Sequence, residues 1–291
     1  MINKKQSSPI FIISSARSGS KLLRDLLISS GELSCYPYDV NYVWKYGNFN
    51  INHDELTLDD LNSRKRAYIR KYFNNIEKDG IRLLEKTVSN SLRLDFVKAI
   101  FPDARIVHLV RDGREVTASL KQCWTEPSFT SRNQSLGSLI RKIINFPWFS
   151  SSSYLKDYIR NNASFIVNGG QLRSWGPRFE GIDEMLAKSS LIEVCASQWS
   201  RSVSCTLDYF RRFPQTDNTF IRYEDLVARP REVLMNANQF LCLNNIEKVC
   251  RSAEESVSVN KKSSWLTVLN DEERALALPI LANCQSILGY E

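Results

Sequence analysis

The chain of 291 residues has the composition of an ordinary globular protein, with 43% hydrophobic and 24% charged residues, so fibrous and disordered classes are excluded. Its apolar runs are only a few residues long, as in Ile10–Ile13, whereas a membrane-spanning helix needs about 20. The 39 basic residues outnumber the 32 acidic residues and give a net charge of +7, which favours anionic partners.

Four short apolar segments have the character of buried strands. They are residues 9–13, 81–85, 105–110 and 219–223. Apolar residues at helical spacing predict helices at about 22–27, 52–78, 92–100, 115–122, 182–213 and 230–241, and a last helix capped by Asn270. Strands that alternate with helices indicate an α/β protein, in which a mostly parallel central sheet has helices on both faces. Residues 123–180 are rich in Ser and Asn, and we expect a variable, partly helical lid or insertion there.

A loop of small and polar residues follows the first predicted strand. Such a strand-to-helix loop directs backbone N–H groups at one point, where the helix dipole also attracts anions. Gly19 permits a close approach, Ser18 and Ser20 offer hydroxyls, and Arg17 and Lys21 add positive charge. The motif is not a Walker A loop, because a serine stands at the first glycine position and the lysine is displaced by one. Taken alone, the loop fits either an anion site or an ordinary turn.

A second basic loop follows the strand at 105–110. Arg111 stands at the end of that strand, and Ser119 lies eight residues later, about two turns into the next helix. A guanidinium and a hydroxyl suit a terminal phosphate. Both loops leave the carboxyl ends of strands, where parallel α/β sheets bind their ligands, so they could hold two phosphates of one nucleotide. A surface salt bridge of Arg111 with Asp112 or Glu115 is the alternative.

Together these segments resemble the sulfotransferases that use 3'-phosphoadenosine 5'-phosphosulfate (PAPS). The resemblance rests on the loop 17–21, on Arg111 and Ser119, and on the run Arg222-Tyr223-Glu224-Asp225-Leu226 with Pro230. It extends from about residue 9 to 290 and is weakest at 36–80 and 123–170. It implies a three-layer P-loop-like fold, in a single domain over 1–291 that includes the insertion at about 123–180.

The resemblance also implies roles for the residues of the two loops. Arg17, Ser18, Gly19 and Ser20 would hold the 5'-phosphosulfate, and Lys21 stands where the family commonly has Thr or Ser. Arg111 and Ser119 would bind the 3'-phosphate, and Tyr223 would contact the same nucleotide. The loop with Lys261 and Lys262 stands where the cytosolic branch has a glycine-rich segment over the nucleotide; here it lacks glycine, and a solvated turn is the alternative.

The catalytic groups are predicted from the second central strand and the segment after the first helix. Glu85-Lys86-Thr87 resembles the Lys-Thr or Lys-Ser segment of the family, and Val88 stands where the cytosolic branch has its catalytic histidine. The chain therefore looks closer to the protein-tyrosine, carbohydrate and bacterial branches, whose base is a carboxylate. We predict Arg17 and Lys86 as the catalytic cations and Asp39 as the base. Glu32 and Glu85 are rival bases, and a turn or cap role for Asp39 is the alternative.

The expected reaction is sulfuryl transfer from PAPS, with release of adenosine 3',5'-bisphosphate (PAP), to a hydroxyl or amine of a small molecule, carbohydrate or peptide. A nucleotide kinase and a non-catalytic protein that binds anions or nucleotides are the alternatives. Nucleic acid is not expected as a partner, because the basic residues are spread along the chain. The region of Trp175-Gly176-Pro177-Arg178 and Gln198 resembles one near the acceptor pocket of bacterial relatives, whereas His108 is expected in the core.

The cysteines and histidines predict the compartment and the metal content. Seven cysteines are scattered without a CxxC pair, and the chain has two histidines. The odd number and irregular spacing indicate reduced thiols, so we expect a cytoplasmic protein. The N-terminal residues are polar and show no apolar stretch of secretory-signal length. Without a close His and Cys cluster, no metal is expected.

Overall fold

The computed structural model of the chain describes residues 8–76, 81–126, 175–257 and 265–290. In these residues, five strands form a sheet in the order β2-β3-β1-β4-β5, and each neighbouring pair is parallel. The strands are β1 (Ile10–Ile13), β2 (Leu33–Ser34), β3 (Arg82–Glu85), β4 (Arg105–Val110) and β5 (Asn218–Arg222). The four strands predicted from the sequence are confirmed, and the two-residue β2 was not predicted.

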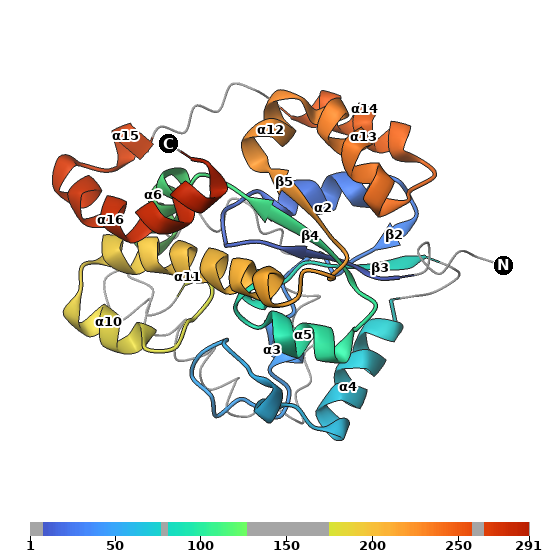
Figure 1. The fold of residues 1–291 in the computed structure, drawn as a ribbon, viewed down its shortest axis with the longest axis horizontal. Coiled ribbons are helices and arrows are strands. Elements are labelled where there is room, and N and C mark those ends of the chain that lie inside the picture. Colours follow the sequence, from blue (N-terminus) through green and yellow to red (C-terminus); the bar gives the residue numbers. More distant parts are fainter. Residues whose placement is uncertain (1–7, 77–80, 127–174, 258–264, 291) are drawn as a thin grey trace.

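Helices cover both faces of this sheet, because successive side chains of a strand point to opposite faces. Ile10 and Ile12 of β1 pack in one core with α2 (Ser20–Ile28), α13 (Pro230–Leu241) and α14 (Ile246–Ser256). Phe11 and Ile13 pack in a second core with α3 (Asn41–Trp44), α4 (Ser63–Asn74), α5 (Leu94–Ile100) and the end of α11 (Leu191–Arg212). Figure 1 shows the sheet between these two groups of helices. The predicted three-layer α/β arrangement is confirmed.

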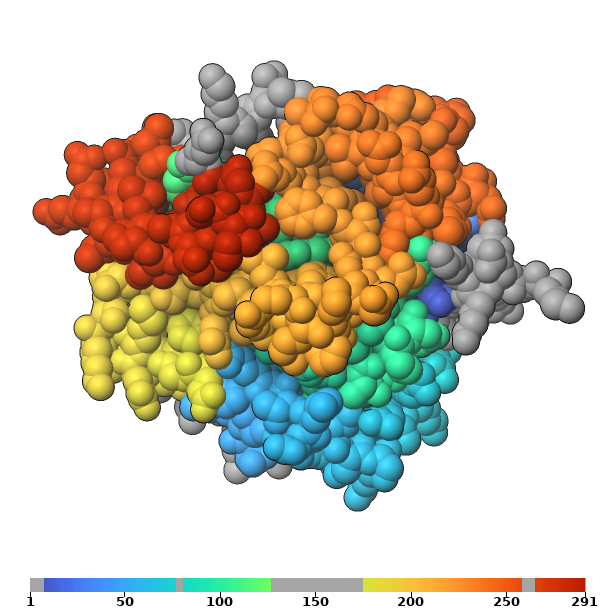
Figure 2. Space-filling model, viewed as in Figure 1, coloured from blue at the N-terminus to red at the C-terminus, as the bar shows by residue number. Residues whose placement is uncertain are grey.

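A third core lies beyond the sheet, between α6 (Gly113–Thr125), α11 and α16 (Asp271–Leu288). Val116, Trp199 and Leu281 belong to it, and each is fully buried. Figure 2 shows α16 against α11 on one face of the molecule. Asn270 caps α16 as predicted, because its side chain accepts a hydrogen bond from the backbone of Glu273. The remaining elements are η1 (Leu58–Asp60), η2 (Val88–Leu92), α10 (Ile182–Lys188), α12 (Tyr223–Ala228) and α15 (Trp265–Val268).

Two predicted helices have different boundaries in the structure. The helix expected over 52–78 begins only at Ser63, where the Asn62 side chain accepts a bond from the Lys65 backbone. The helical region expected over 182–213 is divided into α10 and α11, because Ser190 caps a new helix together with Glu193. A cap residue sets where a helix begins, and the spacing of apolar residues does not reveal this boundary.

Some predictions concern residues outside the described ones. These are the predictions for Lys261 and Lys262 and for most of the insertion, residues 127–174. Among the helices that are described, none combines the length and apolar character needed to cross a bilayer. The seven cysteines all lie among the described residues, and none of them forms a disulfide.

Candidate functional site

The candidate site lies at the edge of the sheet where the strands end. Because all strand pairs are parallel, the segments after β1, β3, β4 and β5 emerge at the same edge. The strand register adds detail, since Val110 of β4 pairs with Arg222 of β5. Arg111 and Tyr223, the next residues along each chain segment, therefore leave the sheet side by side. Ligands of parallel α/β sheets bind at this edge.

The loop between β1 and α2 has an unusual backbone. Arg17 has a φ of 67° and Gly19 a φ of 90°, both in the left-handed region. Such a conformation is costly for a residue with a Cβ, and strained residues often occur at ligand sites. The Ser15 and Ser18 hydroxyls are 2.6 Å apart and buried, so they hold the loop together.

Ser20 is the first residue of α2 and is 5% exposed, so its backbone N–H belongs to the helix N-terminus, where anions bind. Lys21, in contrast, is exposed on the first turn of the helix. The prediction that Lys21 belongs to the phosphate loop therefore has less support than the prediction for Ser20.

The two basic loops meet through side chains. Arg111 donates from Nη1 to the carbonyl oxygen of Arg17 at 3.2 Å, and Arg17 donates from Nε to Oγ of Ser119 at 2.9 Å. Tyr223 joins the same cluster, since its ring lies 4.7 Å from the Arg111 guanidinium carbon. A Cβ placed on Gly19 would come within 2.3 Å of that ring. Residues from three strand ends thus form one basic cluster.

Glu115 is part of this cluster as well. Its carboxylate lies 3.4 Å from Arg111 Nη2, so the salt bridge considered as an alternative for Arg111 is present. Glu115 also accepts a hydrogen bond of 3.1 Å from the backbone N–H of Trp265. This bond fixes the chain that follows Lys262 to the helix that carries Ser119.

A lysine–aspartate pair lies on the other side of β1. Lys86 follows β3, and its Nζ donates to Oδ1 of Asp39, while the backbone N–H of Val88 donates to Oδ2 at 3.3 Å. Lys86 is 9% exposed and Asp39 is 32% exposed, so the carboxylate is the more accessible partner. Asp39 makes no capping bond to α3, whose N-cap residue is Val40, but it accepts its bond from the first backbone N–H of η2, so the cap alternative for Asp39 stays open.

The two rival carboxylates have surroundings that differ from those of Asp39. Glu85 is 2% exposed and accepts hydrogen bonds from Trp44, Thr87 and Asn90. Burial raises the pKa of Glu85, so this group resists ionisation. Glu32 precedes β2, at the opposite edge of the sheet, and accepts bonds from the backbone of the 244–245 turn.

The segment that begins at Trp175 lies beside the loop between β1 and α2, called the donor loop below after the role we propose for it. Gln198 of α11 donates from Nε2 to the carbonyl oxygens of Trp175 and Pro177, at 2.8 Å and 3.0 Å. A Cβ placed on Gly176, between them, would lie 4.0 Å from the Cβ of Ala16. The segment 175–178, which the sequence associates with an acceptor, is therefore adjacent to the loop that follows β1.

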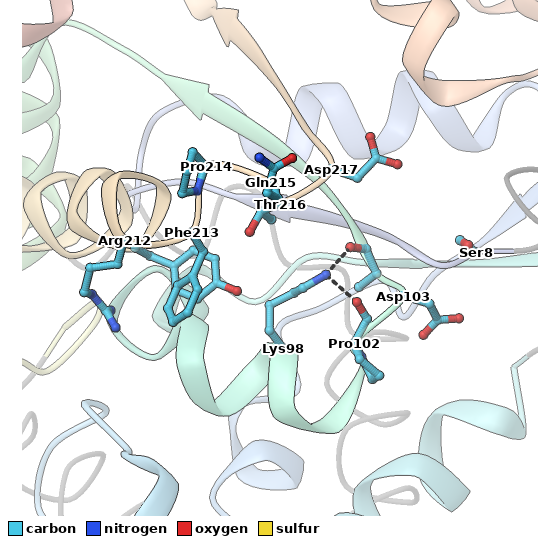
Figure 3. A pocket seen from close by; sticks show the side chains of 12 residues that line it. Ser8, Lys98, Pro102, Asp103, Arg212, Phe213, Pro214, Gln215, Thr216 and Asp217 are labelled. Atoms are coloured by element: carbon cyan, nitrogen blue, oxygen red, sulfur yellow. Dashed lines mark hydrogen bonds between the residues drawn. The ribbon is translucent and has the colours of Figure 1, made fainter.

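A pocket of about 580 Å³ lies at the opposite edge of the sheet (Figure 3). It is lined by Ser8 and by the segments that precede β4 and β5. Its cations are already engaged: Lys98 donates to the carbonyl oxygens of Pro102 and Ala104, and Arg212 pairs with two aspartates. None of the site residues predicted from the sequence lines this pocket. Among the described residues, no group of three or more His, Cys, Asp or Glu side chains could hold a metal ion.

Comparison with known proteins gives a family match. Residues 9–145 match the sulfotransferase family, and no curated protein matches the chain. Among solved structures, sulfotransferase STF9 from Mycobacterium avium is similar over 98% of this chain and 78% of its own, with a TM-score of 0.58 and 12% identity. The sulfotransferase domain of the Synechococcus PCC 7002 olefin synthase is 19% identical, with coverage of 98% and 96% and a TM-score of 0.49. Mouse sulfotransferase SULT7A1, complexed with PAP, is 12% identical, with coverage of 98% and 89% and a TM-score of 0.48.

Proposed function

The match over residues 9–145 supports the sulfotransferase family for this chain, and on that premise we propose that PAPS is its sulfuryl donor. The observation that carries this proposal is the contact between the two basic loops. Arg111 bonds to the backbone of Arg17, and the Arg17 guanidinium bonds to Ser119. A donor with anionic groups at two positions requires two such loops at one edge of the sheet.

The parts of the donor are assigned by the chemistry of each loop. The loop with Arg17, Ser18, Gly19 and Ser20 would bind the 5'-phosphosulfate at the N-terminus of α2. Arg111, Ser119 and Tyr223 would bind the 3'-phosphate end of the nucleotide. Lys261 and Lys262 are proposed to reach the same end, a proposal supported by the bond between Trp265, just after that loop, and Glu115.

The transfer itself needs a base and cations. In the proposed reaction, Asp39 takes the proton of the acceptor hydroxyl or amine while that oxygen or nitrogen forms its bond to sulfur. The bond from sulfur to the phosphate oxygen breaks, and its electron pair stays on the phosphate of PAP. Lys86 and Arg17 would neutralise the negative charge that develops in the transition state. The proton on Asp39 then passes to water. The acceptor itself is proposed only as a hydroxyl or amine of a small molecule, carbohydrate or peptide.

The donor proposal is tested by binding of PAP. We expect PAP to raise the melting temperature of the wild-type protein, and Arg111→Ala to weaken binding about 10- to 100-fold, because the proposed guanidinium contact with the 3'-phosphate would be lost. Arg211→Ala is the control, since Arg211 is 81% exposed. A shift with ATP and Mg²⁺ but not with PAP would favour a kinase. Salt-dependent binding of heparin or DNA without a nucleotide effect would favour an anion-binding protein.

The catalytic half is tested by transfer of labelled sulfate from PAPS to a panel of phenols, sugars, alcohols and amines. For an acceptor found in this panel, Asp39→Asn is expected to lower kcat by about 10²–10⁴-fold, the usual contribution of a positioned base. PAP affinity is expected to stay near the wild-type value, because Asp39 lies outside the cluster of the two basic loops. Full activity of Asp39→Asn would exclude this carboxylate as the base.

A further inference from the structure

The buried carboxylate of Asp54 connects three segments, which contain Asn41, Ser89 and Arg178. Asp54 is 3% exposed. Its Oδ1 accepts a hydrogen bond from the Asn41 amide at 2.9 Å, and its Oδ2 accepts bonds from Ser89 Oγ and the Arg178 backbone N–H, both at 2.9 Å. The N–H of Asp54 donates in turn to the Arg178 carbonyl oxygen at 2.6 Å. These partners are 13, 35 and 124 residues away in the sequence.

The surroundings of Asp54 favour its ionised form. Burial by itself would raise the pKa of Asp54, but the charges of Arg93 and Lys45 and the hydrogen bonds bring the pKa below its usual value. Arg93 also donates to the side-chain oxygens of Asn41 and Asn90, at 2.5 Å and 2.9 Å. The Asn41 amide therefore lies between the buried Arg93 and the buried Asp54. Its oxygen faces the cation and its NH₂ group faces the anion, and these two contacts fix its orientation.

Each partner of Asp54 is close in the chain to a group of the candidate site. Asn41 comes two residues after Asp39, and Ser89 comes three residues after Lys86. Arg178 ends the segment whose Gly176 lies against Ala16 of the donor loop. Asp54 thus bonds to the same two segments that the Lys86–Asp39 pair connects.

We propose that Asp54 is a positioning residue for the transfer reaction: it holds the segments of Asp39 and Lys86 in register with each other and with the segment 175–178 beside the donor loop. This inference rests on the proposed function and adds to it a residue that touches neither donor nor acceptor. A carboxylate suits this role because it offers several acceptor sites to donors from different segments.

The test compares Asp54→Asn with Glu55→Gln. In Asp54→Asn the negative charge is lost. One carboxylate oxygen is replaced by an NH₂ group, which cannot accept the hydrogen bonds that this oxygen accepted. Glu55 is the adjacent carboxylate; its side chain is 12% exposed and pairs at 2.7 Å with Arg201, which is 51% exposed. With a sulfate acceptor from the panel, Asp54→Asn is expected to lower kcat/KM for the acceptor at least about tenfold and to shift the acid limb of its pH profile. The Kd for PAP is expected to change less than about twofold in Asp54→Asn. Glu55→Gln is expected to match the wild type in kcat/KM, in the pH profile and in the Kd for PAP.

Ser89→Ala provides a second, milder variant if Asp54→Asn fails to fold. It removes one of the bonds to Asp54 on the Lys86 side and is expected to lower kcat/KM about threefold, with unchanged PAP affinity. Acceptor kinetics and pH profile equal to the wild type in the folded variants would overturn the positioning role. An equal loss of PAP affinity would also overturn it, since it would indicate general damage to the fold. If the wild type itself bound no PAP, the proposed function would be wrong, and the positioning role would fall with it.

Discussion

Gly19 illustrates how closely the loop after β1 approaches Tyr223, which follows β5. Its φ of 90° suits glycine, and a Cβ there would meet the Tyr223 ring at 2.3 Å. Gly181 has a similar φ of 82° but no atom within 4 Å of a Cβ placed on it. Both glycines therefore have a left-handed backbone, but only at Gly19 would a Cβ meet another side chain.

We predict that Gly19→Ala destabilises the protein more than Gly181→Ala does. Both variants pay about 1–2 kcal/mol for the left-handed backbone, and Gly19→Ala adds about 1–3 kcal/mol because the Tyr223 ring must move. Gly19→Ala should also weaken PAP binding, whereas Gly181→Ala should not. Urea unfolding and calorimetry with PAP measure the two effects. Equal losses of stability in the two variants would show that Tyr223 is not in the way.

Single residues were predictable where the chemistry is local in the chain. The loop 17–21 and the spacing from Arg111 to Ser119 are visible as short motifs, and the structure brings Arg17, Arg111 and Ser119 together. Asp54 was not predicted, because its partners are spread over the chain and no spacing rule connects them. The contact of Glu115 with Arg111 was foreseen as an alternative, but its bond to Trp265 was not.

At the scale of elements, hydrophobic patterns predicted the strands better than the helix boundaries. Each of β1, β3 and β4 is buried along its whole length, so its apolar run is distinctive. Residues 52–62 have a polar, helix-like composition, but backbone and side-chain bonds around Asp60 and Lys65 stabilise a loop there. Boundaries depend on such polar contacts, which apolar periodicity does not report.

The start of α11 tests the importance of one cap. The Ser190 hydroxyl and the Glu193 carboxylate form a capping box there. We predict that Ser190→Ala lowers the free energy of unfolding by about 1 kcal/mol, because an N–H of the first turn loses its acceptor. Ser189→Ala, one position outside the cap, should have little effect. Thermal unfolding measures both, and equal melting temperatures for the two variants would contradict the role of the cap.

The whole molecule depends on distant segments that meet at one edge of the sheet. Alternating strands and helices predicted the parallel sheet, and a parallel sheet places all strand ends together. The third core between α6, α11 and α16 was not predicted, although it carries Trp199, whose indole N–H donates to the Arg111 carbonyl oxygen at 3.1 Å. Trp199 of α11 thus supports the backbone of Arg111, 88 residues earlier in the chain, and no local sequence pattern predicts this contact.

His108 should make the stability of the whole protein depend on pH. It lies in β4, 3% exposed, with the rings of Phe210 and Phe220 each 5.7 Å away, so the expectation of a core histidine is confirmed. Burial lowers the pKa of His108 from 6.5 to about 4, so from about pH 6.5 down to about pH 4 the unfolded chain binds a proton that the folded protein does not. Acid therefore favours unfolding in this range.

We predict that this histidine alone contributes a loss of about 3 kcal/mol in the free energy of unfolding between about pH 7 and pH 4. His108→Gln does not titrate, so its stability should fall less over the same range, even if it is less stable than the wild type at neutral pH. Urea unfolding at several pH values measures the two slopes. Parallel curves for His108→Gln and the wild type would mean that the buried imidazole is protonated in the folded protein as readily as in the unfolded chain.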